Sequence, residues 1–186
     1  MNRIRCGVFG SLLILAASFT APCSFADENK LIHDWKETHE DGDIKLISNH
    51  PAPFPFSTKG EPEATLTISS EAVSPETKSL AKIISSEIKD IRKEIQIAEY
   101  MEEDGHKPDK DIVKYVQDIE GVKVGFIKYR AGGVVGGASV LPRTAIHGIF
   151  IKGDMVYFVH LIVLFAGHQN EVREDQLRII RSLIKA

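Results

Sequence analysis

The chain has 186 residues, of which 43% are hydrophobic and 26% charged, and its formal net charge is −3. That length is enough for one domain with a sizeable core. The mild acidity and the lack of a basic patch argue against nucleic acid and anionic lipid as partners, because both are bound through clustered Lys and Arg side chains.

The first 26 residues have the pattern of a cleavable signal peptide. Arg3 and Arg5 precede an apolar stretch over residues 6–21, and Ser24-Phe25-Ala26 offers small residues where a signal peptidase cleaves. We therefore expect residues 27–186 to form a single exported domain. It would be periplasmic or secreted and would keep no membrane span after cleavage.

Both cysteines, Cys6 and Cys23, lie inside this predicted signal peptide. The mature domain would then contain no cysteine and could form no disulfide in an oxidising compartment. Two alternatives are a short membrane anchor and a lipoprotein acylated at Cys23. The apolar stretch is shorter than the roughly 20 residues of a membrane-spanning helix, and Pro22 departs from the residues that precede a lipidated cysteine.

The first elements of the domain are strands. Asp41-Gly42 predicts a tight hairpin between strands at 31–40 and 43–49. Prolines recur between 51 and 63, which predicts a loop, because proline donates no hydrogen bond to a central strand. Alternation of apolar and polar residues over 64–70 predicts the next strand.

A long helix is predicted over residues 75–103. Ser74 is a suitable N-cap and Pro75 suits the first helical position. One face of this helix would be apolar, with residues recurring at spacings of three and four. These residues are Leu80, Ile84, Ile88, Ile91, Ile95 and Ala98.

Four strands and a helix should follow an acidic loop at 102–111. Glu120-Gly121 predicts a hairpin between 112–119 and 122–130, and the glycine-rich residues 131–139 predict a connection. The strand Met155–Phe165 is almost wholly apolar and must be covered on both faces. It would pair with 145–151 across Lys152-Gly153-Asp154. Asn170 is predicted to cap the final helix.

This order predicts an α+β domain with a mainly antiparallel sheet covered by a long helix and a C-terminal helix, that is, a layered α/β/α sandwich. The helix after 64–70, the turn Lys152-Gly153-Asp154, the long apolar strand and the C-terminal helix together resemble the PsbP-like and DcrB-like superfamily of exported proteins. The resemblance implies a mostly non-enzymatic role, such as an accessory subunit, an envelope protein or an immunity protein against a secreted toxin. It implies no catalytic residues.

Three histidines are candidates for a zinc site. If Gly153-Asp154 forms the turn, His147 lies directly opposite His160, and opposed side chains are close enough to share an ion. His168 follows the strand. A hydrolase that uses zinc held by His147, His160 and His168 is therefore one alternative, although no His-Glu-x-x-His spacing is present.

The preferred hypothesis is an exported, non-enzymatic binding protein with no cofactor and no metal, possessing neither a nucleophile motif nor a phosphate-binding loop. Its partner would be another protein with a basic surface, for example a toxin neutralised by direct binding. A carrier of a small apolar ligand, held between sheet and helix, is a further alternative. The predicted contact residues are Glu102, Glu103, Asp104, Asp109 and Asp111.

Overall fold

A computed structural model describes residues 31–40, 42–52, 60–74, 79–99, 112–135, 138–164 and 168–186. The predicted signal peptide and the acidic loop at 102–111 lie outside these ranges. The elements in chain order are β1 Trp35–Glu40, β2 Asp43–Ser48, β3 Ala64–Ala72, α1 Leu80–Glu99, β4 Val113–Ile119, β5 Val122–Val135, β6 Ala138–Lys152, β7 Met155–Val163 and α2 Gln169–Lys185.

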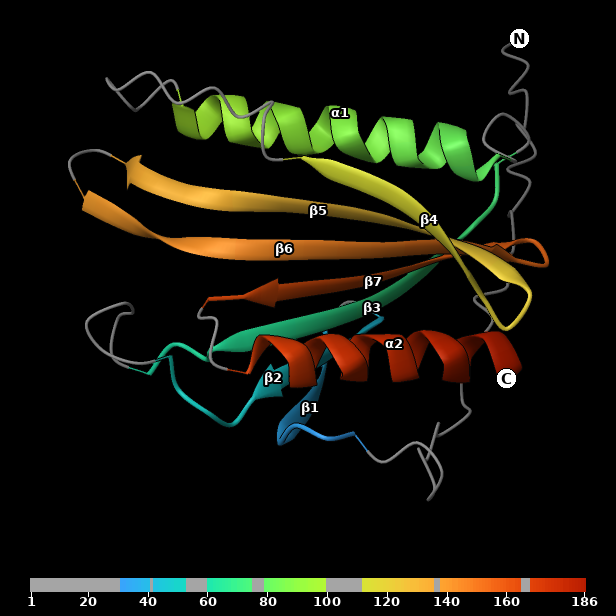
Figure 1. Cartoon of the computed structure of the whole chain (residues 1–186), viewed down its shortest axis with the longest axis horizontal. Coiled ribbons are helices and arrows are strands. Elements are labelled where there is room, and N and C mark those ends of the chain that lie inside the picture. The colour runs from blue at the N-terminus through green and yellow to red at the C-terminus, as the bar shows by residue number, and fades with distance from the viewer. Residues whose placement is uncertain are drawn as a thin grey trace, which may run out of the picture.

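The strands form one seven-stranded sheet in the order β1-β2-β3-β7-β6-β5-β4 (Figure 1). Every neighbouring pair is antiparallel. Two runs of consecutive strands, β1–β3 and β4–β7, meet where β3 pairs with β7. The chain passes through α1 on its way from β3, in the middle of the sheet, to β4 at the edge. The α+β class predicted from the sequence is therefore confirmed.

The two helices pack against different faces of the sheet. Successive side chains of a strand point to opposite faces, and Phe126 and Ile127 on β5 are both fully buried. Phe126 belongs to a core cluster with Ile180 of α2. Ile127 belongs to a second cluster with Ile88 of α1. Each face of the central strands is thus covered by one helix.

Glycines let both helices approach these strands closely. A Cβ atom at Gly125 of β5 would lie 2.3 Å from Cδ1 of Ile84 on α1. At Gly148 of β6 it would lie 2.8 Å from Cδ1 of Ile180 on α2. A larger residue at either position would force the facing isoleucine side chain to move.

The central hairpin forms with the predicted turn and register. Lys152 pairs with Met155, so Gly153 and Asp154 are the two turn residues. His147 consequently pairs with His160. The predicted hairpin around Glu120-Gly121 is also present, with Ile119 opposite Val122.

Both predicted helix starts were wrong. α1 spans Leu80–Glu99, whereas the sequence pattern predicted a helix over 75–103 with Ser74 as the N-cap; residues 100–103, where that helix was predicted to end, lie outside the described ranges. The carbonyl of Ser79 accepts the first helical hydrogen bond, from the amide of Ile83. α2 begins at Gln169 with His168 as the N-cap, so Asn170 lies inside the helix. The predicted buried face of α1 is correct, because Ile84, Ile88 and Ile91 are all buried (Ile95 and Ala98 are not described).

The described parts of the glycine-rich stretch, residues 131–135 and 138–139, are strand and not a connection. β5 continues to Val135 and β6 begins at Ala138. Their register shifts between Ala131 and Gly133, an irregularity of the kind that glycine permits in a strand. The prediction of a connection over residues 131–139 was therefore wrong for the described residues, because these residues lie in strands.

The inner face of α2 carries two polar residues that are fully buried, Asp175 and Gln176. The Gln176 side chain donates hydrogen bonds to the carbonyls of Ile146, at 2.8 Å, and Val159, at 2.6 Å. These bonds fasten α2 to β6 and β7. Among the described residues, neither helix combines the length and the apolar character that crossing a bilayer requires.

Candidate functional site

Histidine and glutamate side chains gather in two places. The His33 cluster consists of His33, Glu63 and His168, and the His160 cluster consists of Glu87, His147 and His160. In each cluster, one nitrogen or oxygen from every residue lies within 4.8 Å of the others. Imidazole nitrogen and carboxylate oxygen are ligands that transition metals prefer.

The buried carboxylate of Asp175 fixes the segment that carries His33. It accepts hydrogen bonds from the backbone amide of Ile32 at 2.7 Å and that of His33 at 2.8 Å. It also accepts one from Trp35 Nε1 at 2.9 Å. All three donors lie just before β1 or at its first residue. Through Asp175, α2 therefore fixes the segment before β1 and sets the position of His33.

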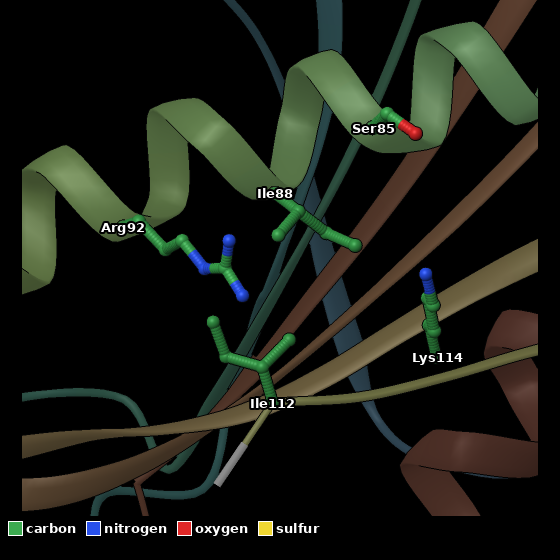
Figure 2. Close-up of a pocket in the computed structure, with 5 residues that line it drawn as sticks. All are labelled: Ser85, Ile88, Arg92, Ile112 and Lys114. Atoms are coloured by element: carbon green, nitrogen blue, oxygen red, sulfur yellow. The ribbon is translucent and has the colours of Figure 1, made fainter. Parts of the chain in front are cut away.

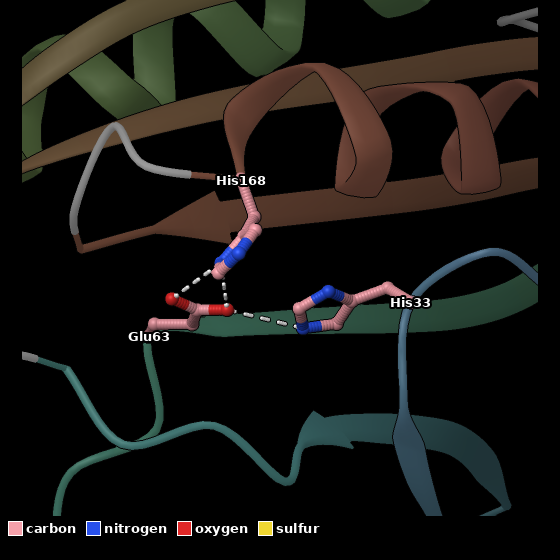
Figure 3. Close-up of side chains that lie close together, drawn as sticks. All are labelled: His33, Glu63 and His168. Atoms are coloured by element: carbon pink, nitrogen blue, oxygen red, sulfur yellow. Dashed lines mark hydrogen bonds and ion pairs between the residues drawn. The ribbon is translucent and has the colours of Figure 1, made fainter.

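The carboxylate of Glu63 lies between two imidazoles (Figure 3). Its Oε1 is 2.9 Å from His168 Nδ1 and 3.2 Å from His33 Nε2, and its Oε2 is 3.1 Å from His168 Nδ1. The side chains of His33 and Glu63 are 1% and 6% exposed, whereas that of His168 is 44% exposed. The cluster therefore has a buried floor and an edge that faces solvent.

A third imidazole, that of His50, completes a ring around this floor. Its centroid lies 5.0 Å from that of His33 and 5.5 Å from that of His168, and the latter two are 5.6 Å apart. A tetrahedral zinc ion with Zn–N bonds of about 2.0–2.1 Å holds imidazole centroids roughly 5 Å apart. The His50 side chain is exposed and would have to turn to bring a nitrogen onto such an ion.

The two histidines in contact with Glu63 have pKa values shifted in opposite directions. Burial lowers the pKa of His33, and the nearby Glu63 only partly opposes this. The hydrogen bond with Glu63 raises the pKa of His168 above its usual value. Because metal ions bind the neutral imidazole, the lowered pKa of His33 favours its metal-binding form, whereas the raised pKa of His168 disfavours it.

The His160 cluster brings together one residue from each of α1, β6 and β7. The rings of His147 and His160 stack with centroids 3.9 Å apart and an interplanar angle of 22°. Glu87 Oε1 lies 2.9 Å from His147 Nδ1 and 3.8 Å from His160 Nε2. The hydrogen bond from His147 lowers the pKa of Glu87, which keeps this carboxylate ionised.

The predicted zinc site of His147, His160 and His168 is not assembled. The first two histidines meet as predicted, but His168 lies at the start of α2, beside Glu63 and His33. α1 contributes Glu87 to the pair on its own face of the sheet, and α2 covers the other face. No local sequence pattern could indicate the true neighbours of His168, because Glu63 and His168 are 105 positions apart.

A small open pocket lies between α1 and the segment that enters β4 (Figure 2). Its volume is about 210 Å³, and it is lined by Ser85, Ile88, Arg92, Ile112 and Lys114. Small-molecule sites are usually larger, roughly 300–1,000 Å³, and mostly apolar. With two cationic side chains in its wall, this pocket does not suit the small apolar ligand that the carrier hypothesis requires.

The predicted partner-binding residues, all between 102 and 111, lie outside the described part of the chain. The structure therefore places none of them relative to either cluster. The acidic-loop interface stays a prediction from the sequence.

No protein-family model and no curated protein matches the sequence. A comparison with solved structures finds PA94, a protein of unknown function from Pseudomonas aeruginosa, with a TM-score of 0.43 and 12% identity. The match covers 82% of this chain and 95% of that chain. A TM-score this low assigns neither a family nor a function, so the resemblance to PsbP-like and DcrB-like proteins stays a proposal.

Proposed function

We propose that this protein is an exported, non-enzymatic binding protein that holds a divalent transition-metal ion, zinc in the first instance, at His33, His50, Glu63 and His168. The observation that carries this proposal is a group of three neighbouring imidazoles with centroid separations of 5.0–5.6 Å, two of which, His33 and His168, contact one buried carboxylate. That spacing suits a shared tetrahedral ion.

The donor set favours a transition metal over calcium or magnesium. Three of its four members are nitrogen ligands, whereas calcium and magnesium take oxygen ligands. Copper and nickel also bind imidazole, and copper binds it more strongly than zinc. Selectivity among these ions would then depend on the tetrahedral geometry that the backbone imposes.

Residues next to the four ligands support their orientation. Glu63 is held at both backbone groups: its amide donates to the carbonyl of His50 at 2.9 Å, and its carbonyl accepts from the amide of Leu164 at 2.7 Å. Ser48 Oγ accepts a hydrogen bond of 3.0 Å from the backbone amide of His50. On the far side of the His33 ring, Nδ1 faces Glu171 at 3.9 Å, and an acidic neighbour of this kind makes a ligating imidazole more basic.

Binding without turnover follows from the number of ligands. A zinc site with four protein ligands is closed, whereas a catalytic site keeps one position for water or substrate. With His50 as the fourth ligand, no such position is left. This supports binding without turnover at the His33 cluster, which agrees with the non-enzymatic role expected from the sequence.

The exported location and a protein partner remain part of the proposal on the strength of the sequence. The signal-peptide pattern over residues 1–26 supports a periplasmic or secreted protein. The charge of the loop at 102–111 supports a partner with a basic surface, an immunity role being one form of it. The layered α/β/α sandwich of the PsbP-like and DcrB-like proteins is proposed on the same footing.

Zinc titration of the purified protein by calorimetry tests the metal site. We expect His168→Ala to abolish the binding of one equivalent of zinc or to lower the affinity for it by at least about 100-fold. Loss of a ligand should exceed the 10–100-fold effect of losing a residue that only supports a ligand. His39→Ala is the matched control, since His39 also pairs with a glutamate, Glu37 at 3.1 Å, but is 70% exposed on β1. Equal zinc binding by the two variants would show that the His33 cluster is only a hydrogen-bond network.

A further inference from the structure

The structure assigns a second site for a divalent transition-metal ion to Glu87, His147 and His160, on the α1 face of the sheet. This site does not depend on the proposed function, because it shares no residue with the His33 cluster. It also differs from the hydrolase site considered above, which required His168.

One unpartnered atom points to a missing ligand here. His160 Nε2 is buried, and no described residue makes a hydrogen bond with it. Buried polar atoms are almost always paired, so each exception calls for an explanation, of which an ordered water or an ion is one. The closest charged group is Glu87 Oε1, at 3.8 Å, which is too far for a hydrogen bond but suited to a second ligand on a shared ion.

The other two donors face the same space. His147 Nδ1 and Glu87 Oε1 are 2.9 Å apart, and all three donor atoms lie within 4.8 Å of one another. An ion placed among them would replace the long contact between Glu87 and His160 by two coordinate bonds. It would also move the two rings apart, from centroids 3.9 Å apart to the roughly 5 Å that a tetrahedral zinc ion requires. Two imidazoles and one carboxylate are a recognised zinc donor set that leaves a fourth position open to water.

The surroundings orient the ligands and leave a way in. Tyr129 Oη is 3.3 Å from His147 Nε2, so the tyrosine oxygen can accept a hydrogen bond from the Nε2–H of His147 when Nδ1 binds a metal. The side chain of His147 is only 9% exposed, but those of Glu87 and His160 are 24% and 28% exposed. An ion can therefore reach the site from the solvent-exposed side of the Glu87 and His160 side chains.

Equilibrium dialysis against zinc, followed by elemental analysis of the protein, tests this inference. The unmodified protein should retain one equivalent more than Glu87→Gln or His160→Ala does. Asp90→Asn is the matched control, because Asp90 lies on the same helix and pairs with Lys93 at the surface. It should retain as much zinc as the unmodified protein. Glu87→Gln also covers the case in which His160→Ala does not fold.

His168→Ala separates this inference from the proposed function. If Glu87→Gln and Asp90→Asn retain equal amounts of zinc, the second site does not exist, whatever His168→Ala does. If Glu87→Gln loses an equivalent and His168→Ala loses none, the second site stands and the proposed function fails. If each loses one equivalent, and the Glu87→Gln/His168→Ala double variant loses two, both sites are established.

Discussion

Asp175→Ala is expected to lower the free energy of unfolding by about 3–5 kcal/mol, because three donors in or near the core lose their acceptor. These are the amides of Ile32 and His33 and the indole of Trp35, all within 2.9 Å of the carboxylate. Each unsatisfied buried group costs about 1–3 kcal/mol. Because Ile32 is exposed, water can hydrogen-bond to its amide and offset part of this cost. Urea unfolding followed by far-ultraviolet circular dichroism measures the effect.

Asp34→Ala is the control for this experiment. Asp34 is an exposed aspartate in the same segment, and it accepts one surface hydrogen bond, from Asn49 at 2.9 Å. Its loss should change stability by no more than about 0.5 kcal/mol. If the two variants had similar stabilities, Asp175 would not be what holds the entrance of β1. His33 would then need another source of order.

Acid should destabilise the metal-free protein between about pH 6.5 and pH 4. Burial and the neighbouring His147 lower the pKa of His160 to about 4, with Glu87 acting in the opposite direction. In this range the unfolded chain binds a proton at His160 that the folded chain does not, so the free energy of unfolding falls with falling pH. One such group contributes a slope of up to about 1.4 kcal/mol per pH unit. The lowered pKa of His33 adds to it.

His168 acts in the opposite sense. Its pKa is raised by Glu63, so its stabilisation is complete below the unfolded pKa of about 6.5 and is lost as pH rises through the folded value. Chemical unfolding of the chelator-treated protein from pH 4 to pH 7.5 measures the sum. We expect His160→Gln to flatten the acid limb and His39→Gln to leave it unchanged. An acid limb of unchanged slope in His160→Gln would contradict the buried, neutral state of His160.

Local patterns in the sequence predicted the parts of the fold that depend on neighbours along the chain. The two-residue turn at Gly153-Asp154 determined the pairing of His147 with His160. The three- and four-residue spacing of isoleucines identified the buried face of α1. Both follow from the fixed periods of strand and helix.

The His33 cluster escaped prediction because its members come from three irregular segments. His33 precedes β1, Glu63 precedes β3 and His168 precedes α2, so no strand or helix period relates them. The burial of Asp175 and Gln176 was equally hidden, since a polar residue on a helix is expected to face solvent. Only the tertiary structure supplies their partners. Those of Asp175 lie at the start of β1 or just before it, and those of Gln176 lie in β6 and β7.

Anomalous diffraction at the zinc edge, from crystals of the zinc-loaded protein, tests the central claim most directly. The proposed function predicts an anomalous peak among Glu63, His33 and His168, about 2.0–2.2 Å from the Glu63 carboxylate, from Nε2 of His33 and from Nδ1 of His168. His50 should have turned to complete the shell. If zinc-loaded crystals instead show no peak there, with His33 Nε2 still hydrogen-bonded to Ser48 Oγ and Glu63 still in direct contact with both imidazoles, the protein does not bind metal at this site.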